Sequence, residues 1–224
     1  MQAIFETIFD VIYLSTVIVL GIIMIKKSKK NSVTFLFGIM AVMLGVGDAF
    51  HLVPRSYGLL TIGLEANAVA LGIGKLITSI TMTIFYLILY YVWRKRYHIT
   101  EKKGLTNTLL SLGIIRIILC FFPQNLWTSI EAPLSWGIYR NIPFLILGII
   151  IIILYFQSAK KNKDKTFSMM WLAITLSFAF YIPVVLFAKT VPLLGMLMIP
   201  KTIAYVWIVI MGYRTIKEQK VATN

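Results

Sequence analysis

Charged residues are scarce in this sequence: they make up 13% of its 224 residues, whereas a soluble domain carries about 25%. Hydrophobic residues make up 59%, and the mean hydropathy is +0.86. A chain of this length cannot bury so much apolar surface in its own core, whereas contact with lipid accounts for it. The composition therefore excludes an ordinary soluble enzyme and predicts one integral membrane domain.

Metal-ligating and redox-active side chains are also few. The single cysteine, Cys120, excludes an intrachain disulfide and provides no thiolate cluster for a metal. The two histidines, His51 and His98, lie far apart in the sequence, so a zinc site at His51 would rely on the carboxylates of Asp10 and Asp48 alone. The sequence has no glycine-rich phosphate loop and no motif of a serine or zinc hydrolase. We expect neither a metal nor another cofactor.

Long apolar runs are the main feature that is present. Each of seven runs holds roughly 20 residues or more, which at about 1.5 Å per residue is enough to cross a hydrocarbon core about 30 Å thick. We predict an all-α bundle of seven transmembrane helices that forms one domain over residues 1–213, followed by a short basic tail at 214–224. The helices are expected at about 3–25, 33–53, 68–93, 104–122, 138–157, 167–188 and 191–213.

Basic residues gather on one side of these seven runs. The connections after the first, third and fifth runs, together with the tail, hold 16 of the 22 lysines and arginines but only three of the eight acidic residues. By the positive-inside rule this side is cytoplasmic, which places the C-terminus inside and the N-terminus outside. The net charge of +14 then reflects topology and contact with anionic membrane lipids, and we expect no nucleic-acid partner. The rich use of lysine and isoleucine indicates a bacterial plasma membrane.

The remaining charges indicate a site inside the membrane. Arg116 and Lys201 lie deepest, about 18 and 20 Å above the basic ends of their helices, and Asp10 and Asp48 lie about 24 Å above theirs. A cation at membrane depth costs about 2.5–3.5 kcal/mol on insertion scales, so it normally faces a partner or a polar cavity. Cations and acids outside the basic side nearly balance, which suggests a paired network: the cations are Arg55, Lys75, Arg116, Arg140, Lys189 and Lys201, and the acids are Glu6, Asp10, Asp48, Glu65 and Glu131.

Helical spacing directs these side chains toward shared faces. Asp48 and His51 stand at i and i+3 on the second run, and Lys201 and Tyr205 stand at i and i+4 on the last. We interpret the pattern as an outward-opening pocket that binds a small anionic or zwitterionic ligand, or a lipid headgroup, for transport or sensing. The predicted ligand-binding residues are Asp10, Asp48, Lys75, Arg116, Arg140, Tyr181, Lys201 and Tyr205.

Other interpretations stay open at this point. Asp48 and His51 could form the acid–base pair of an intramembrane lipid hydrolase or, with Arg55, a structural ion pair and helix cap. The deep cations could instead be neutralised internally by the intramembrane acids. As an accessory subunit, the chain would pair its charged helices with a partner membrane protein. The glycine-rich stretches at 45–47 and 72–74 could pack within one chain or between copies of a homo-oligomer.

A seven-span chain with a lysine inside its last span, here Lys201, resembles the rhodopsins in outline. That resemblance implies a retinal-type pigment with a Schiff base on Lys201. The third run, however, carries Lys75 where those proteins commonly place a carboxylate counterion. The outline also resembles the ceramidase and adiponectin-receptor group of lipid hydrolases, but the histidine pair of their last span is missing here, so their metal site does not carry over.

Overall fold

The computed structural model of the chain describes residues 2–61, 63–129 and 131–221, and these residues form an all-helical fold. Within these ranges, seven helices are long and apolar enough to cross a membrane, which confirms the predicted type and number of candidate spans. Two short 3₁₀ segments, η1 and η2, lie in the connections. The elements are α1 (Gln2–Lys26), α2 (Val33–Leu60), α3 (Ala68–Arg96), α4 (Lys103–Phe121), η1 (Pro123–Asn125), α5 (Leu134–Lys161), α6 (Met170–Phe187), η2 (Pro192–Leu197) and α7 (Met198–Val221).

Two helix boundaries differ clearly from the predicted ones. The predicted second helix ends at residue 53, whereas α2 continues through Pro54 to Leu60. An internal proline removes one helical hydrogen bond, and membrane helices tolerate it because neighbouring groups satisfy the freed carbonyl. The last span begins with the 3₁₀ turns of η2, and α7 then runs from Met198 to Val221. Most of the tail predicted at 214–224 therefore continues the last helix.

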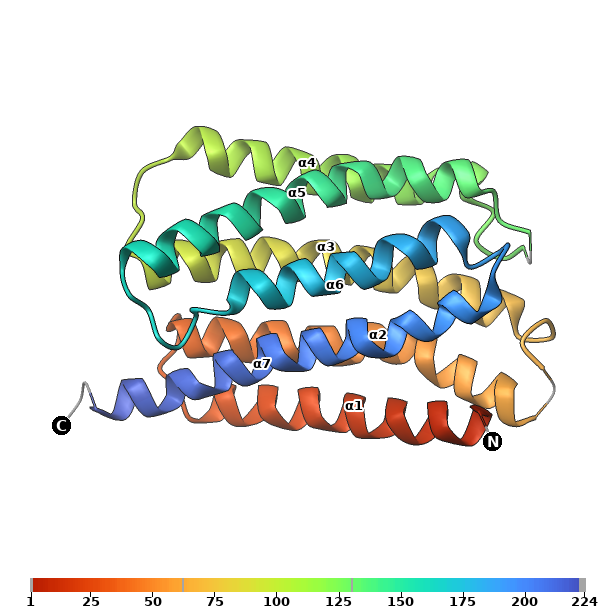
Figure 1. Ribbon diagram of the computed structural model, residues 1–224, viewed down its shortest axis with the longest axis horizontal. Coiled ribbons are helices and arrows are strands. Elements are labelled where there is room, and N and C mark those ends of the chain that lie inside the picture. Colours follow the sequence, from red (N-terminus) through yellow and green to blue (C-terminus); the bar gives the residue numbers. More distant parts are fainter. Residues whose placement is uncertain (1, 62, 130, 222–224) are drawn as a thin grey trace.

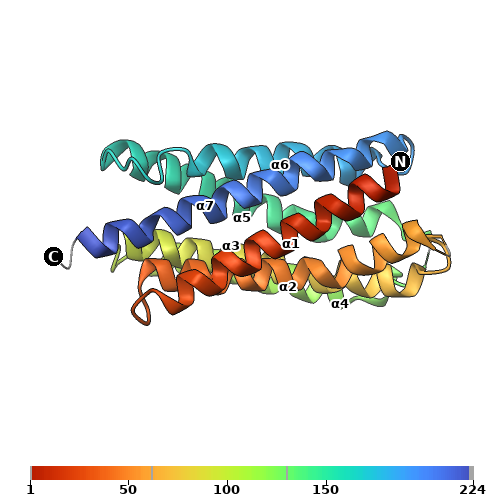
Figure 2. The same cartoon turned by 90° about the horizontal axis from the view of Figure 1, so that it is seen from below.

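The helices run side by side along the long axis of the molecule, and the two chain termini lie at opposite ends (Figure 1). α1 packs against α2 and α7 at one edge, and α4 packs against α3 and α5 at the other. α6 joins α5 to α7. Seen from below, α6 and α7 lie on one side of the bundle, and α2 and α4 lie on the other (Figure 2). Side chains of several helices can thus meet in the middle of the bundle.

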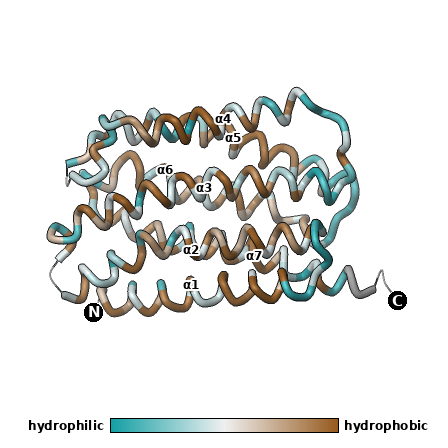
Figure 3. The backbone as a smooth tube through the Cα atoms, turned by 180° about the vertical axis from the view of Figure 1, so that it is seen from behind, coloured by the Kyte–Doolittle hydropathy of each residue, from teal (hydrophilic) through white to brown (hydrophobic). Residues whose placement is uncertain are grey.

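Hydropathy follows this arrangement. The helices are hydrophobic along most of their length, and hydrophilic residues collect toward the two ends of the bundle (Figure 3). On α1 the large apolar side chains of Ile4, Ile8 and Ile12 are each more than half exposed. An outward apolar surface of this kind suits contact with lipid rather than with water.

The centre of the bundle contains a cluster of five aromatic rings. Phe85 of α3 contacts Tyr205 of α7. Its neighbour Tyr86 contacts Phe144 of α5 and Phe178 of α6. The ring centroids of these pairs are 5.0–5.6 Å apart. The contacts are edge-on or tilted, the geometries that aromatic rings prefer. This cluster ties four helices together, and two of its rings, Phe144 and Tyr205, also line a polar cavity.

At the basic end, a group of charges that we call the Arg96 clasp joins α3, the α5–α6 connection and α7. The Arg96 guanidinium donates to both carboxylate oxygens of Asp164, at 2.9 and 3.0 Å, and also to Glu218. The Tyr97 hydroxyl donates to Asp164 at 3.1 Å. Burial opposes ionisation of Asp164, but the hydrogen bonds from Arg96 and from a backbone N–H outweigh it and hold the pKa of Asp164 below its ordinary value.

Candidate functional site

Glycines bring α2 and α3 together where the polar residues lie. A Cβ on Gly74 would lie 2.2 Å from the Phe50 carbonyl oxygen and 2.7 Å from the His51 Cα. A Cβ on Gly47 would lie 2.3 Å from the hydroxyl oxygen of Thr81. Gly47 and Gly74 thus pack within the chain, and the close approach of the two helices depends on the absence of a side chain at each. It holds the polar face of α2 against α3.

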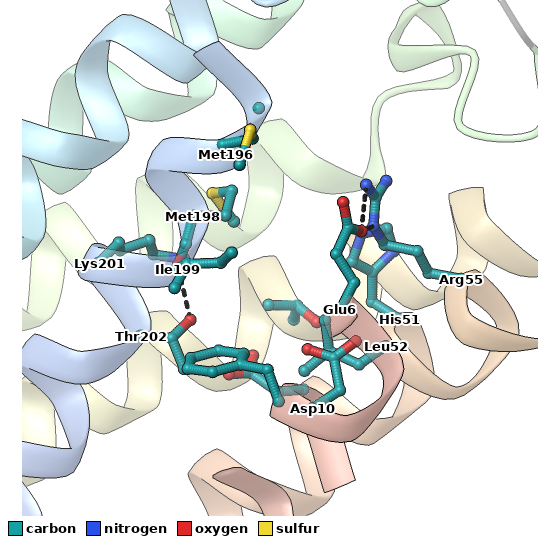
Figure 4. Close-up of a pocket in the computed structure, with 14 residues that line it drawn as sticks. Glu6, Asp10, His51, Leu52, Arg55, Met196, Met198, Ile199, Lys201 and Thr202 are labelled. Atoms are coloured by element: carbon teal, nitrogen blue, oxygen red, sulfur yellow. Dashed lines mark hydrogen bonds and ion pairs between the residues drawn. The ribbon is translucent and has the colours of Figure 1, made fainter. Parts of the chain in front are cut away.

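A cavity of about 140 Å³ lies between α1, α2, α3 and α7 (Figure 4). We call it the acidic cavity, because the carboxylates of Glu6, Asp10 and Asp48 line it. In Figure 4, Lys201 and Thr202 of α7 lie on one side, and Glu6 and Asp10 of α1 lie on the other. The polar residues predicted on the first, second and last spans thus face a common space.

The two carboxylates of α1 have different partners. Glu6 accepts hydrogen bonds from Arg55 at 2.9 and 3.2 Å, which form an ion pair between α1 and α2. Asp10 accepts one long hydrogen bond, 3.3 Å from the hydroxyl of Ser56. Within the described ranges, Asp10 has no ion pair. Asp10 therefore presents a carboxylate to the acidic cavity without a cation bound to it.

Asp48 and His51 also have separate partners. Asp48 is only 8% exposed, and it accepts a 2.6 Å hydrogen bond from the Tyr13 hydroxyl. His51 Nδ1 lies 3.3 Å from the carbonyl oxygen of Leu71; because a carbonyl only accepts, Nδ1 carries the hydrogen, and in the neutral ring Nε2 is left as an acceptor. No hydrogen bond joins Asp48 to His51 in the described part of the chain. The hydrolase alternative stays a prediction that this geometry does not support.

A second cavity, of about 170 Å³, lies among α3, α4, α5, α6 and α7. We call it the basic cavity, because four cations line it and no carboxylate does among the residues that the structure describes. Two tyrosines also line this cavity. The cations are Lys75, Arg116, Arg140 and Lys201, and the tyrosines are Tyr181 and Tyr205.

Arg116 is the most deeply buried of these cations, with 2% of its surface exposed. Its guanidinium carbon lies 3.4 Å from the ring centroid of Phe144, a cation–π contact. Nη2 donates one weak hydrogen bond, 3.5 Å long, to the side-chain oxygen of Asn141, which also accepts from Tyr181 at 3.2 Å. Nε and Nη1 are buried without any hydrogen-bond partner in the described structure. The guanidinium is thus fixed in position but lacks a counterion.

Lys201 lines both cavities and forms part of the wall between them. It is 7% exposed, and its Nζ lies 5.0 Å from the ring centroid of Tyr181 and 5.3 Å from that of Tyr205. No hydrogen bond or ion pair to Nζ is present among the described residues. The charged groups that interact electrostatically with Lys201 are Asp48 on the acidic side and Arg116 on the basic side.

The other two cations of the basic cavity are less enclosed. The Arg140 guanidinium donates to the Asn125 side chain at 2.8 Å and lies 4.3 Å from a ring centroid of Trp127. Lys75 is exposed and marks the rim of the cavity. Lys189 lies outside both cavities, is exposed, and donates to a backbone carbonyl of the α4–α5 connection.

The structure places every predicted ligand-binding residue on one of the two cavities. It also shows two positioning residues that sequence reasoning missed, Tyr13 and Asn141. Polar side chains inside apolar runs are the signal that could have found them, because Tyr13 stands three residues after Asp10 and Asn141 directly follows Arg140. Asp10 and Asp48 line the acidic cavity, Lys75, Arg116, Arg140, Tyr181 and Tyr205 line the basic cavity, and Lys201 lines both.

Metal binding and a retinal pigment can also be compared with this geometry. Within the described ranges, no three His, Cys, Asp or Glu side chains are grouped so that they could hold a metal ion. For a pigment on Lys201, the carboxylate that interacts electrostatically with the amine is Asp48. Asp48 lies on the second helix rather than on the third. The retinal alternative stays a prediction.

Comparison with known proteins finds nothing similar: no protein-family model matches the chain, and neither a curated protein nor a solved structure matches it. The function must therefore be argued from the two cavities themselves.

Proposed function

We propose that the protein binds the anionic group of a small ligand in the basic cavity, in order to transport or sense that ligand. The observation that supports this proposal is the Arg116 guanidinium, which is buried with two nitrogens unpartnered in a cavity that four described cations and no described carboxylate line. A permanent charge in this position is costly unless an anion joins it.

The chemistry of the cavity favours a carboxylate or a phosphate as the bound group. A guanidinium presents its N–H donors as a rigid fork that matches the paired oxygens of either group. A buried donor left without a partner costs about 1–3 kcal/mol, and more where the group is charged; a bound anion would recover this cost. Lys201 and Arg140 add positive potential around the same space, and Tyr181, whose hydroxyl donates to Asn141, borders it.

Binding can be measured on the purified protein in detergent with inorganic phosphate and acetate as probes. An anion that binds only the folded state raises the temperature of unfolding as its concentration increases. We expect this rise for at least one probe in the wild type and its loss in Arg116→Met. Lys189→Met is the matched control, because it removes an exposed cation that lies outside both cavities. An unchanged response in Arg116→Met, or none in the wild type, would refute the proposal.

Transport and sensing differ in what happens after binding. Sealed vesicles that contain the protein should accumulate a labelled anion if the bound ligand crosses the membrane, and Arg116→Met vesicles should not. Binding without accumulation would assign a sensing role. A hydrolase, in contrast, should release product in detergent, where no sealed compartment exists.

We also propose that the basic end of the bundle faces the cytoplasm of a bacterial plasma membrane. Support comes from the lysines and arginines that flank the spans at this end, since the positive-inside rule relates such residues to the cytoplasmic side. The native thiol of Cys120 is buried, so an introduced cysteine can be labelled selectively. A membrane-impermeant maleimide applied to intact cells should label Glu65→Cys and should leave Lys29→Cys unlabelled. The reverse pattern would invert the topology.

A further inference from the structure

The acidic and basic cavities adjoin each other. Both are lined by His51, Thr78, Met198 and Lys201, which form a shared wall. On one side of this wall lie three carboxylates and the Arg55 guanidinium, and on the other side lie three further cations. The two cavities therefore lie side by side, and carboxylates predominate on one side of the wall and cations on the other.

On the acidic side, Asp10 is the carboxylate that lacks a cation. Arg55 is already engaged by Glu6 in a 2.9 Å ion pair. The charge of Lys201 interacts electrostatically with Asp48. The charged groups that interact in this way with Asp10 are Arg55 and the other two carboxylates. The Asp10 carboxylate is half-buried and has only the 3.3 Å hydrogen bond from a serine hydroxyl among the described residues. A cation placed beside it would be stabilised by charge and by hydrogen bonding.

On the basic side, the almost fully buried Arg116 lacks an anion, whereas the charge of Lys201 already interacts with Asp48. Arg116 has two unpartnered nitrogens, and Lys201 has cation–π contacts but neither a hydrogen bond nor an ion pair in the described structure. Lys201 is only 7% exposed and lines both cavities. Each of the two cavities thus holds a charged group without a bound counterion. One molecule that passes between the residues of the shared wall would supply both counterions.

We infer that the ligand is a zwitterion, with a carboxylate or phosphate bound in the basic cavity and a primary ammonium bound beside Asp10 in the acidic cavity. This inference rests on the proposed function, because it takes the anion site of Arg116 as given. A primary ammonium suits the acidic cavity, since it donates hydrogen bonds to carboxylates. Amino acids with separated charges, aminoalkyl phosphates and the headgroup of an ethanolamine lipid share this chemistry.

Pairs of probes that differ only in the ammonium group test the inference. The soluble pairs are O-phosphoethanolamine with ethyl phosphate, and 4-aminobutyrate with butyrate. The lipid pair is lysophosphatidylethanolamine with lysophosphatidylethanol. Affinities are measured on the full chain for the wild type, Asp10→Asn and Arg116→Met. Glu65→Gln is the matched control for removal of an acid, because Glu65 is exposed and lines neither cavity.

In at least one pair, the wild type should bind the ammonium-bearing probe about tenfold more tightly than its partner, as expected for one charge-assisted hydrogen bond. Asp10→Asn should abolish this preference without weakening the anionic partner, and Glu65→Gln should retain it. The pair that shows the preference identifies the source of the ligand.

Equal affinities within all three pairs would overturn the inference, and so would an Asp10→Asn variant that keeps the preference. If Asp10→Asn does not fold, Ser56→Ala replaces it, because Ser56 is the only hydrogen-bond donor to Asp10 in the described structure. Ser56→Ala should alter the preference for the ammonium-bearing probe. An unchanged preference would overturn the inference. Failure of the anion site itself gives a different result, because Arg116→Met would then bind every anionic probe as well as the wild type does.

Discussion

The Tyr13 hydroxyl on α1 donates a 2.6 Å hydrogen bond to the Asp48 carboxylate on α2, and both side chains are more than nine-tenths buried. The bond gives a carboxylate at membrane depth a partner and fixes α1 against α2 beside the acidic cavity. It also explains why Asp48 is oriented toward α1 rather than toward His51 on its own helix.

Replacing Tyr13 by phenylalanine should therefore destabilise the protein. Tyr13→Phe leaves a buried acceptor without its donor, which costs about 1–3 kcal/mol. The free energy of unfolding in detergent, followed by circular dichroism, should fall by this amount. Tyr57→Phe should change little, since Tyr57 is 55% exposed. Equal stability of Tyr13→Phe and the wild type would show that another group satisfies Asp48.

Arg116 should reduce the stability of the ligand-free protein. Its guanidinium has two unpartnered nitrogens, so Arg116→Met should raise the free energy of unfolding by about 1–3 kcal/mol in the absence of anions. Arg96→Met should have the opposite effect, because the Arg96 guanidinium is bonded to Asp164 and Glu218. Thermal unfolding of both variants in anion-poor buffer tests the contrast. Loss of stability in both would mean that Arg116 has a structural partner.

The contact between α2 and α3 should depend on Gly74. In Gly74→Ala the new Cβ would meet the Phe50 carbonyl oxygen at 2.2 Å, and the helices would have to separate. Overpacking of this kind costs about 1–3 kcal/mol. The variant should unfold at lower temperature and bind anions more weakly, because His51 and its neighbours shift with α2. Gly104→Ala is the control, since its Cβ would meet nothing within 4 Å; similar behaviour of the two variants would contradict the close approach.

Acid should weaken the Arg96 clasp. The pKa of Asp164 is lower in the folded protein than its ordinary value of 3.8, so its ionised form adds full stability above that value. This contribution is lost as the pH falls through the lower folded-state pKa. At neutral pH, Asp164→Asn should unfold at a lower temperature than the wild type, and the gap should narrow toward pH 3. Glu101→Gln, which removes an exposed acid, should follow the wild type. A gap that stays constant with pH would exclude ionised Asp164 as its cause.

Much of the fold could be predicted from local properties of the sequence. Seven apolar runs of spanning length predict seven helices, because hydrophobicity and the rise per residue act on each run separately. Depth along a helix is also a local quantity, so the placement of Arg116 and Lys201 below Asp10 and Asp48 could be argued by counting residues. The helix ends were less predictable: α2 passes through Pro54, since neighbouring helices decide whether a freed carbonyl is satisfied.

The pairing of the charges was decided by tertiary structure. Sequence spacing places Asp48 and His51 on one face, yet Asp48 bonds to Tyr13 and His51 bonds to Leu71. A near balance of acids and cations suggested mutual pairing, but Arg116 faces a cavity with no described carboxylate. Rotation and tilt of each helix depend on packing against its neighbours, such as the fit of α2 against Gly74. Spacing along one chain segment cannot specify that packing, so only the folded bundle decides which charged side chains line each of the two adjoining cavities.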